Sequence, residues 1–303
     1  MALVLLTVLG AAGAGVVAER RTASAGRAAR TVLALMLYAL VPYVSFVNIA
    51  HLHVTVAAGT GLAVAYAGLA VTGGLAHLAG RRLGLPPAER GALICASILV
   101  NTGYLGLPMT VVLLGSHQLA SAIAYDQLIS GPMLFVAGFG VGAALGTRAG
   151  SSGRARLRAF LVRNPPLLAV IAGLLAPPSL APHALVSASH VVVAALLPLG
   201  FFVVGVSLSA ERREEHAPLI EPPDRRVAIA VGLRLLVTSG VLLTFSAALV
   251  RLPRAYLLQG AMPTGVNSLL VGHAYGLDQR LIATAILWST TLVVVIALLV
   301  AVL

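Results

Sequence analysis

Charged side chains are scarce in this sequence, and two residue types are missing or nearly so. Asp, Glu, Lys and Arg make up 10% of the 303 residues and hydrophobic residues 59%, whereas soluble globular chains carry about 25% charged residues. This composition excludes a water-soluble fold. No lysine is present, and Cys95 is the one cysteine, so an intrachain disulfide and a cysteine-based metal cluster are excluded as well.

Apolar runs of membrane-spanning length are what the sequence has instead. A helix needs about 20 predominantly apolar residues to cross the hydrocarbon core of a bilayer. Ten such runs lie near residues 2–18, 31–50, 54–79, 90–115, 120–146, 164–180, 185–209, 226–250, 255–275 and 280–302. Short connectors take up the remainder, so we predict an all-α integral membrane protein with ten transmembrane helices and no soluble domain.

The arginines fall on alternate connectors between these runs. Seventeen lie on the odd-numbered connectors, and only Arg251 and Arg254 lie on an even-numbered one. Cytoplasmic loops carry an excess of Lys and Arg, so we expect a multi-pass protein of the cell (cytoplasmic) membrane with both termini outside. The first run has no positive charge before it and two arginines soon after it, which favours a retained helix over a cleaved signal peptide. The net charge of +11 is thus a topology signal, and no nucleic-acid partner is expected.

Prolines inside the apolar runs indicate that the two halves are repeats. Pro42 and Pro108 are separated by 66 positions, and Pro198 and Pro263 by 65. Because each half has five runs, the second half enters the membrane in the opposite orientation, as in the inverted repeats of secondary transporters. We predict a first five-helix repeat at 1–147, a cytoplasmic connector at 148–163 and a second repeat at 164–303. A chance match of the prolines is the alternative.

Two of the runs contain helix-breaking residues at corresponding places, 101–108 in the fourth run and 260–268 in the ninth. Proline removes a backbone donor and glycine favours irregular backbone. Free backbone polar groups are tolerated at membrane depth only inside protein or beside a polar cavity, where a helix that begins there directs its positive end at an anion. The predicted substrate-binding residues are Asn101, Gly103, Tyr104, Pro108, Pro263, Thr264, Gly265, Asn267 and Ser268. The alternatives are kinked packing helices and helix-to-helix hydrogen bonds from the two asparagines.

The same motifs resemble those of a known family. Asn-Thr-Gly-Tyr-Leu-Gly-Leu-Pro over 101–108, Met-Pro-Thr-Gly-Val-Asn over 262–267 and Tyr-Gly-Leu-Asp over 275–278 resemble the auxin efflux carrier family and its bacterial members. Arg-Asn-Pro-Pro over 163–166 and the stretch from Leu197-Pro198-Leu199 through Gly205 agree, so the resemblance covers nearly the full chain.

The resemblance implies a five-plus-five inverted fold with a scaffold of spans 1, 2, 6 and 7 and a mobile transport domain of spans 3–5 and 8–10. It also implies a homodimer formed through the scaffold. By the same resemblance, Asn101 contacts a substrate carboxylate where the broken helices cross, and Pro108 and Pro263 are the crossover prolines. Asn267 matches bacterial relatives, whose association with malate or malonate implies a small carboxylate substrate.

Two charged residues lie well inside apolar runs and are candidates for coupling. Asp126 is the only acid well inside a run, so it is a candidate for proton or cation coupling, with a structural ion pair or an exposed cap as alternatives. Arg234 is a candidate substrate counter-ion, and snorkelling to the inner interface is the competing explanation. His51 and His53 lie on an outer connector without a third ligand, so no metal site is expected.

These observations predict a secondary transporter that moves a small organic anion across the cytoplasmic membrane by alternating access of the elevator type. The sequence contains no nucleophile-and-base constellation and no phosphate-cradling loop, so neither enzymatic activity nor a cofactor is expected. Two alternatives stay open at this point. One is a sodium-coupled carrier of the bile-acid type, and the other is a membrane receptor that binds its ligand without transporting it.

Overall fold

The computed structural model describes residues 2–52, 56–148, 165–214 and 221–302, and the regular elements of these residues are helices. The predicted all-α class is therefore confirmed. The helices of the first half are α1 (Ala2–Arg21), α2 (Ala25–Leu35), α3 (Val41–Ile49), α4 (Val56–Arg82), α5 (Pro87–Ile98), α6 (Leu107–Leu114), α7 (Leu119–Tyr125) and α8 (Phe139–Leu145). Those of the second half are α10 (Pro165–Leu175), α11 (His183–Glu214), α12 (Arg225–Gly232), α13 (Thr238–Ala248), α14 (Arg254–Gly260), α15 (Asn267–Tyr275) and α16 (Gln279–Val302).

Short turns of other helix types join several of these helices. Two are 3-10 turns, η3 (Ser116–Gln118) and η6 (Pro178–Leu180). The π-helical turns are η1 (Met36–Leu40), η2 (Thr102–Gly106), η4 (Asp126–Ser130), η5 (Met133–Gly138) and η7 (Leu233–Val237). Because π-turns widen a helix and are frequent at functional sites, their placement in η2, η4 and η7 bears on the site described below.

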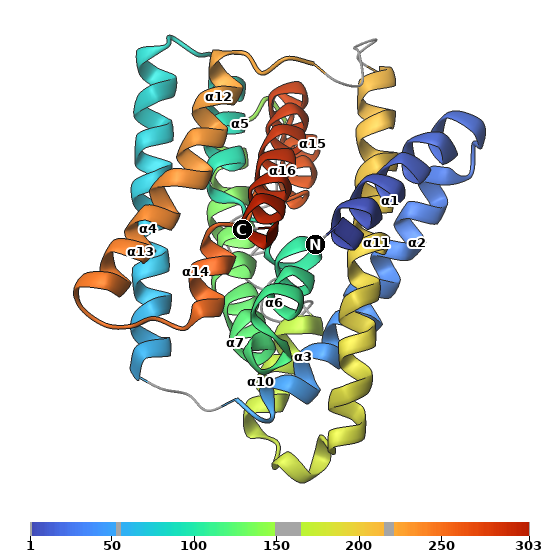
Figure 1. The fold of residues 1–303 in the computed structure, drawn as a ribbon. Helices are drawn as coiled ribbons and strands as arrows, with labels where there is room; N and C mark the ends of the chain where they lie inside the picture. Colours follow the sequence, from blue (N-terminus) through green and yellow to red (C-terminus); the bar gives the residue numbers. More distant parts are fainter. Residues whose placement is uncertain (1, 53–55, 149–164, 215–220, 303) are drawn as a thin grey trace.

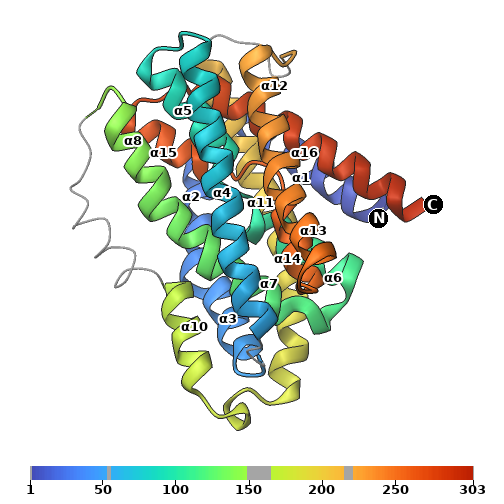
Figure 2. The same ribbon diagram turned by 90° about the vertical axis from the view of Figure 1, so that its left-hand side faces the viewer.

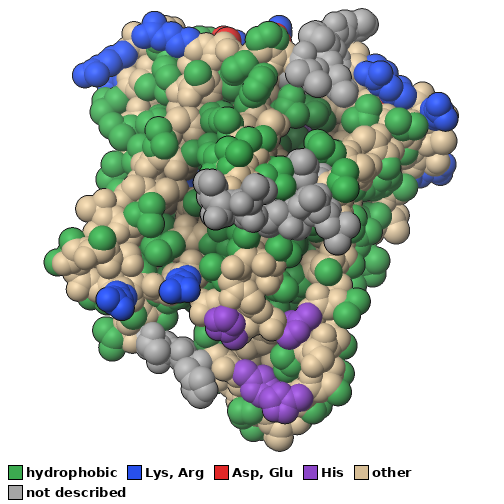
Figure 3. Space-filling view, viewed as in Figure 1, with side chains coloured by type: hydrophobic (Ala, Val, Ile, Leu, Met, Phe, Trp, Pro, Cys, Tyr) green, Lys and Arg blue, Asp and Glu red, His purple; other side chains and the backbone are tan. Residues whose placement is uncertain are grey.

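Six helical stretches in the described residues are long and apolar enough to cross a membrane. They are Ala25–Ile49, Val56–Arg82, Ser116–Leu145, His183–Ala210, Arg225–Ala248 and Gln279–Leu299. Hydrophobic side chains are spread over the visible flank of the molecule, and the basic side chains gather mainly at its upper end (Figure 3). These features indicate a multi-pass membrane protein. The count of ten spans and the inverted repeat stay predictions.

The helices form two groups that each pack within themselves. One group consists of α1, α2, α3, α10 and α11, and the other of α4 to α8 and α12 to α16. In Figure 1, α1, α2 and α11 lie on the right and α4, α12 and α13 on the left, and Figure 2 shows α10 and α3 below α8 and α4. A Cβ on Gly205 of α11 would lie 2.0 Å from the Ala12 carbonyl oxygen, and one on Gly15 would lie 2.2 Å from that of Phe202. Small residues thus let α1 and α11 approach closely.

An ion-pair network joins three helix starts at the upper end of the second group. Arg226 of α12 contacts Glu89 at 2.6 Å, Asp224 at 2.7 Å and Asp278 at 3.3 Å. Asp224 also caps α12 by accepting the Val227 N–H at 2.9 Å. Burial alone would raise the pKa of Asp224, but the Val227 N–H and the Arg226 guanidinium outweigh burial and lower it. The network therefore ties α5, α12 and the turn before α16 together.

Candidate functional site

Two non-helical segments lie side by side between the helices. The first segment, residues 99–101, separates α5 from η2 and α6, and the second segment, residues 261–266, separates α14 from α15. The Asn101 N–H donates to the Pro263 carbonyl at 2.9 Å, and the Gly265 N–H donates to the Leu99 carbonyl at 2.8 Å, which makes an antiparallel bridge centred on Val100 and Thr264. This pairing satisfies backbone groups that hydrocarbon could not satisfy.

The second segment is anchored by its own small and hydroxylated residues. A Cβ on Gly265 would lie 2.7 Å from the carbonyl oxygen of Val100, so only glycine allows the two backbones to approach this closely. The Thr264 hydroxyl donates to the Ala96 carbonyl at 2.8 Å, and the Thr264 N–H donates to the Ser289 hydroxyl at 3.1 Å. These contacts fix the second segment between the end of α5 and the middle of α16.

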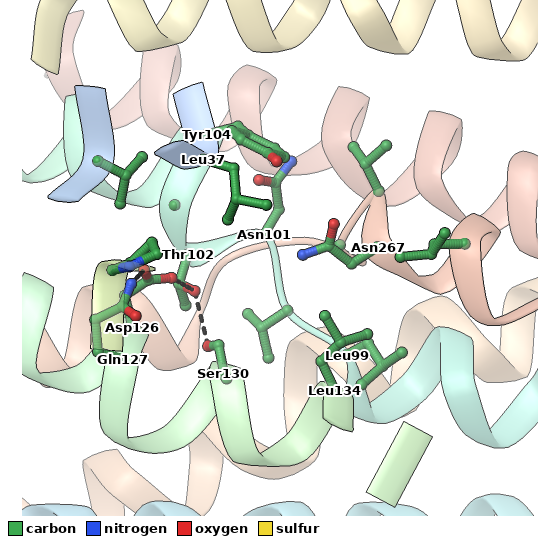
Figure 4. A pocket seen from close by; sticks show the side chains of 18 of the residues that line it. Leu37, Leu99, Asn101, Thr102, Tyr104, Asp126, Gln127, Ser130, Leu134 and Asn267 are labelled. Carbon is green, nitrogen blue, oxygen red and sulfur yellow. Dashed lines mark hydrogen bonds between the residues drawn. The ribbon is translucent and has the colours of Figure 1, made fainter. Parts of the chain in front are cut away.

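A cavity of about 270 Å³ lies beside the paired segments, between the two helix groups. The wall from α2, η1, α3 and α10 is apolar and consists of Leu33, Met36, Leu37, Val41 and Pro166. The opposite wall is mixed and consists of Leu99, Val100, Asn101, Thr102, Gly103, Tyr104, Asp126, Gln127, Ser130, Gly131, Leu134, Phe135, Gly265, Val266, Asn267 and Leu270. Figure 4 shows the polar side chains of this wall, with Leu37 near Tyr104 and Asn101 in this view. We call this cavity the central pocket.

Two asparagines line the central pocket, Asn101 from the first segment and Asn267 from the start of α15 (Figure 4). Asn101 is 3% exposed, and its side-chain oxygen accepts the Leu105 N–H at 3.3 Å. Its amide nitrogen is buried and has no hydrogen-bond partner among the described residues. Asn267 is the first residue of α15 and is exposed. A buried donor without a partner is costly, so the Asn101 amide is equipped to bind an acceptor on a ligand.

A second polar group of the pocket is arranged around Asp126, the first residue of η4. The Thr102 hydroxyl donates to one carboxylate oxygen of Asp126, and the Gln127 amide donates to the other at 2.6 Å. The hydroxyls of Thr102 and Ser130 are 2.7 Å apart, so Ser130 donates to Thr102 when Thr102 donates to the carboxylate. Asp126 is thus held by neutral donors, and no described ion pair includes it.

The predicted substrate residues divide into two sets. Asn101, Gly103, Tyr104, Gly265 and Asn267 line the central pocket. Tyr104 also packs on Gly200 of α11, where a Cβ would lie 2.8 Å from the Tyr104 Cβ, so it lies at the boundary between the helix groups.

The other predicted residues do not line the pocket. Pro108 lies in the first turn of α6, and Pro263 accepts the Asn101 N–H. The Thr264 hydroxyl donates a hydrogen bond to the Ala96 carbonyl, and the Ser268 hydroxyl donates one to the Gly265 carbonyl. Their described contacts support the paired segments.

The sequence reasoning missed three polar lining residues, Thr102, Gln127 and Ser130. Thr102 and Gln127 each adjoin a residue that was singled out, and Ser130 lies one helical turn after Asp126. A helical spacing of four residues from the only acid in a span was the signal that could have found Ser130.

Arg234 of η7 lies outside the pocket lining and is fully buried, at 0% exposed. Its guanidinium donates to the Gly260 carbonyl at 2.8 Å and to the Ser97 carbonyl at 3.3 Å. A side chain with no exposed surface does not reach the membrane interface, so it does not snorkel. Its partners are backbone carbonyls at the ends of α14 and α5.

The histidines form no metal centre in the described residues. His51 stacks on His183 with ring centroids 5.9 Å apart, and its Nε2 lies 2.7 Å from the Ala181 carbonyl oxygen. His53 lies outside the described residues. No group of three metal-ligating side chains occurs in the part of the chain that the structure describes.

Comparison with known proteins gives a family match and two relatives. The profile of a family described as membrane transport protein matches residues 159–301. An uncharacterised transporter of Methanocaldococcus jannaschii is 26% identical over 232 residues, which are 72% of this chain and 70% of that protein. The family match and this relative together support membership of the family. The resemblance to auxin efflux carriers, which are members of it, is thereby confirmed.

A second relative matches a shorter stretch of the chain. An uncharacterised transporter of Methanothermobacter thermautotrophicus is 33% identical over 105 residues, 35% of this chain and 33% of that protein. Family and relatives point to a membrane transporter and away from an enzyme.

Proposed function

We propose that this protein is a secondary transporter that carries a small organic anion, a carboxylate of the malate or malonate type, across the cytoplasmic membrane. The observation that carries the proposal is the buried, unpartnered amide nitrogen of Asn101 in the central pocket. An amide donor that lacks a protein partner gains most from a ligand that brings an acceptor. A carboxylate brings two such oxygens.

Helix starts at the pocket favour the same ligand charge. The helical chain resumes at Thr102 after the first segment and at Asn267 after the second, and both residues line the pocket. The first N–H groups of a helix have no partner within that helix, and its N-terminus carries a partial positive charge. An anion in the pocket would therefore be bound by two asparagine amides and two helix starts. The volume of about 270 Å³ suits a small ligand, because pockets for drug-sized ligands measure about 300–1,000 Å³.

The transport mechanism that fits the two helix groups is alternating access of the elevator type. In this proposal the ten runs are ten spans in a five-plus-five inverted repeat with both termini outside. The group of α1, α2, α3, α10 and α11 is the scaffold, through which two copies dimerise, and the remaining helices move with the substrate. The apolar wall formed by Leu33, Met36 and Leu37 gives the moving group a surface to slide past without breaking hydrogen bonds.

Asp126 is the proposed coupling residue of this transporter. It lines the pocket next to Thr102, so its charge and that of a bound anion act on each other directly. Protonation of the carboxylate would remove a like charge from the pocket and favour anion binding. Coupling to a proton gradient follows from that difference in affinity.

Uptake of labelled malate, malonate and an aromatic carboxylate into proteoliposomes tests the proposal, under imposed pH and sodium gradients. We expect flux with the native protein and a loss of at least about tenfold in Asn101→Ala and Asn267→Ala, the equivalent of one or two hydrogen bonds to a charged group. Saturable binding without flux would assign a receptor instead.

Asn48→Ala is a matched control. Asn48 is also buried, but its amide donates to Val44 and to Ser189 at 2.9 Å and does not line the pocket. We expect Asn48→Ala to lower the unfolding temperature while leaving the KM for uptake within about twofold of native, because it removes an interaction used only by the fold. Equal losses of affinity in Asn48→Ala and Asn101→Ala would contradict a role of Asn101 in binding.

A further inference from the structure

Close packing around Arg234 does not by itself explain why a charged side chain is buried there. It is the largest fully buried side chain among the described residues, and none of their ion pairs includes it. Its Nε has no hydrogen-bond partner in this part of the chain. A buried guanidinium without a carboxylate is costly in a membrane protein, so what it contacts requires an explanation.

The two contacts of Arg234 are both at helix C-termini. Ser97 is the penultimate residue of α5, and Gly260 is the last residue of α14. The last four carbonyls of a helix have no partner within it, and the C-terminus carries a partial negative charge. One guanidinium therefore receives the negative ends of the two helices that lead into the paired segments.

Arg234 lies where α5 and α14 end, on the other side of the paired segments from the pocket. The helices that end at Arg234 are α5 and α14, whereas the helical segments that begin at Thr102 and Asn267 face the pocket. Arg234 itself does not line the pocket. It lies behind the paired segments, beside Gly260, whose carbonyl also accepts the Ser239 hydroxyl at 3.2 Å.

We propose that Arg234 is a built-in cation that neutralises the C-termini of α5 and α14, takes the place of a coupling metal cation, and thereby makes the central pocket selective for anions. Carbonyl oxygens that converge at two helix ends are ligands that a hard cation such as Na⁺ would use. Here a covalently attached charge fills that position at all times. Arg234 is thus a positioning residue that acts on the substrate through the field of the helix ends.

Two consequences follow for transport. Native uptake does not depend on sodium, because the cation position is occupied by the protein itself. Removal of the charge leaves two helix C-termini facing each other without compensation, and it weakens anion binding. A unit charge acting over a distance on the order of 10 Å at an effective dielectric constant of about 20 corresponds to roughly a tenfold change in affinity or more.

Chemical rescue of Arg234→Ala tests this proposal, which rests on the proposed anion transport. The probes are labelled malonate for uptake and guanidinium chloride at non-denaturing concentration, with sodium chloride and potassium chloride as salt controls. We expect uptake by Arg234→Ala to fall at least about tenfold and guanidinium to restore part of it, with a rise in the unfolding temperature of the variant. The matched control is Leu242→Ala, because Leu242 is buried and lies against Gly260 but carries no charge.

Rescue confined to Arg234→Ala supports the proposal. Equal rescue of Leu242→Ala, native-like uptake by Arg234→Ala, or sodium-dependent uptake by the native protein overturns it. If Arg234→Ala does not fold, Arg234→Lys decides: sodium-independent uptake within about threefold of native supports a fixed charge, and a folded lysine variant without uptake contradicts it. If the native protein transports no anion, the proposed function fails, while guanidinium-specific stabilisation of Arg234→Ala still reports the cation position.

Discussion

The two non-helical segments pair with each other, but they are built differently. The first segment has three residues and includes Asn101, whose amide nitrogen has no described partner, and the next residue, Thr102, contacts Asp126. The second segment has six residues, and its polar residue Thr264 is used for contacts with α5 and α16. The helix that follows the second segment, α15, contributes its first residue, Asn267, to the pocket. In the proposed transporter the first segment therefore binds the substrate, whereas the second segment is held in place by contacts with α5 and α16.

The two charged residues near the segments also differ in whether they line the pocket. Asp126 lies in the pocket wall beside the first segment, whereas Arg234 lies behind both segments on the carbonyls that precede them. The acid can meet a ligand, and the guanidinium cannot touch it. Each of the following predictions compares a change at or beside one segment with the same type of change elsewhere in the protein.

The largest difference is expected from alanine in place of glycine. In Gly265→Ala the new Cβ would lie 2.7 Å from the oxygen and 2.9 Å from the carbon of the Val100 carbonyl, both backbone atoms that move only if the segments separate. We expect loss of transport and a destabilisation of about 2–3 kcal/mol from overpacking, measured as a lower unfolding temperature.

Gly103→Ala is the counterpart next to the first segment. Its Cβ would meet the Asp126 carboxylate at 3.5 Å, an ordinary contact, so we expect an unfolding temperature close to native. Equal unfolding temperatures of Gly265→Ala and Gly103→Ala would contradict the proposed difference between the two segments.

The second prediction concerns the carboxylate of Asp126, which is contacted by Thr102, the residue after the first segment. Asp126→Asn keeps the size of the side chain and removes its titratable charge. We expect accumulation driven by an imposed pH gradient to fall to the level without a gradient, while exchange of labelled malonate across the membrane continues. The physical reason is that exchange needs binding and movement, whereas accumulation needs a proton to bind and leave.

Asp224→Asn is the control for Asp126→Asn. It removes a carboxylate in the upper ion-pair network, outside the pocket. Accumulation driven by the pH gradient is expected to persist. A pH-gradient response in Asp126→Asn equal to that of the native protein would exclude Asp126 as the coupling residue.

Much of this site could be predicted from local sequence. Glycine and proline at 260–268 fall in or next to the second segment, because these residues act on their own backbone. The first segment, residues 99–101, has neither residue type, and Gly103, Gly106 and Pro108 lie in the helical run that follows it. Composition and apolar runs were sufficient for the all-helical membrane class, because bilayer thickness sets run length.

What could not be predicted depends on contacts between residues far apart in the chain. The sequence leaves Arg234 with two explanations, and only the placement of Ser97 and Gly260 around it shows a third. Likewise the apolar wall around Met36 has no signal that distinguishes it from any lipid-facing turn. Thr264 was predicted to bind substrate, but its described contacts are with the protein, and the sequence does not say which way a hydroxyl in a non-helical segment points.

The smallest effects are expected from the two threonines, and they separate stability from binding. Thr264→Val keeps the shape and removes the hydroxyl that donates to Ala96, so we expect a loss of about 1 kcal/mol in stability with an unchanged KM for malonate. Thr102→Val removes the donor to Asp126, so we expect a shifted pH dependence of uptake with a smaller change in unfolding temperature. Unfolding scans and uptake at several pH values on both variants provide the test. A change of KM in Thr264→Val with native stability would show that the second segment also binds.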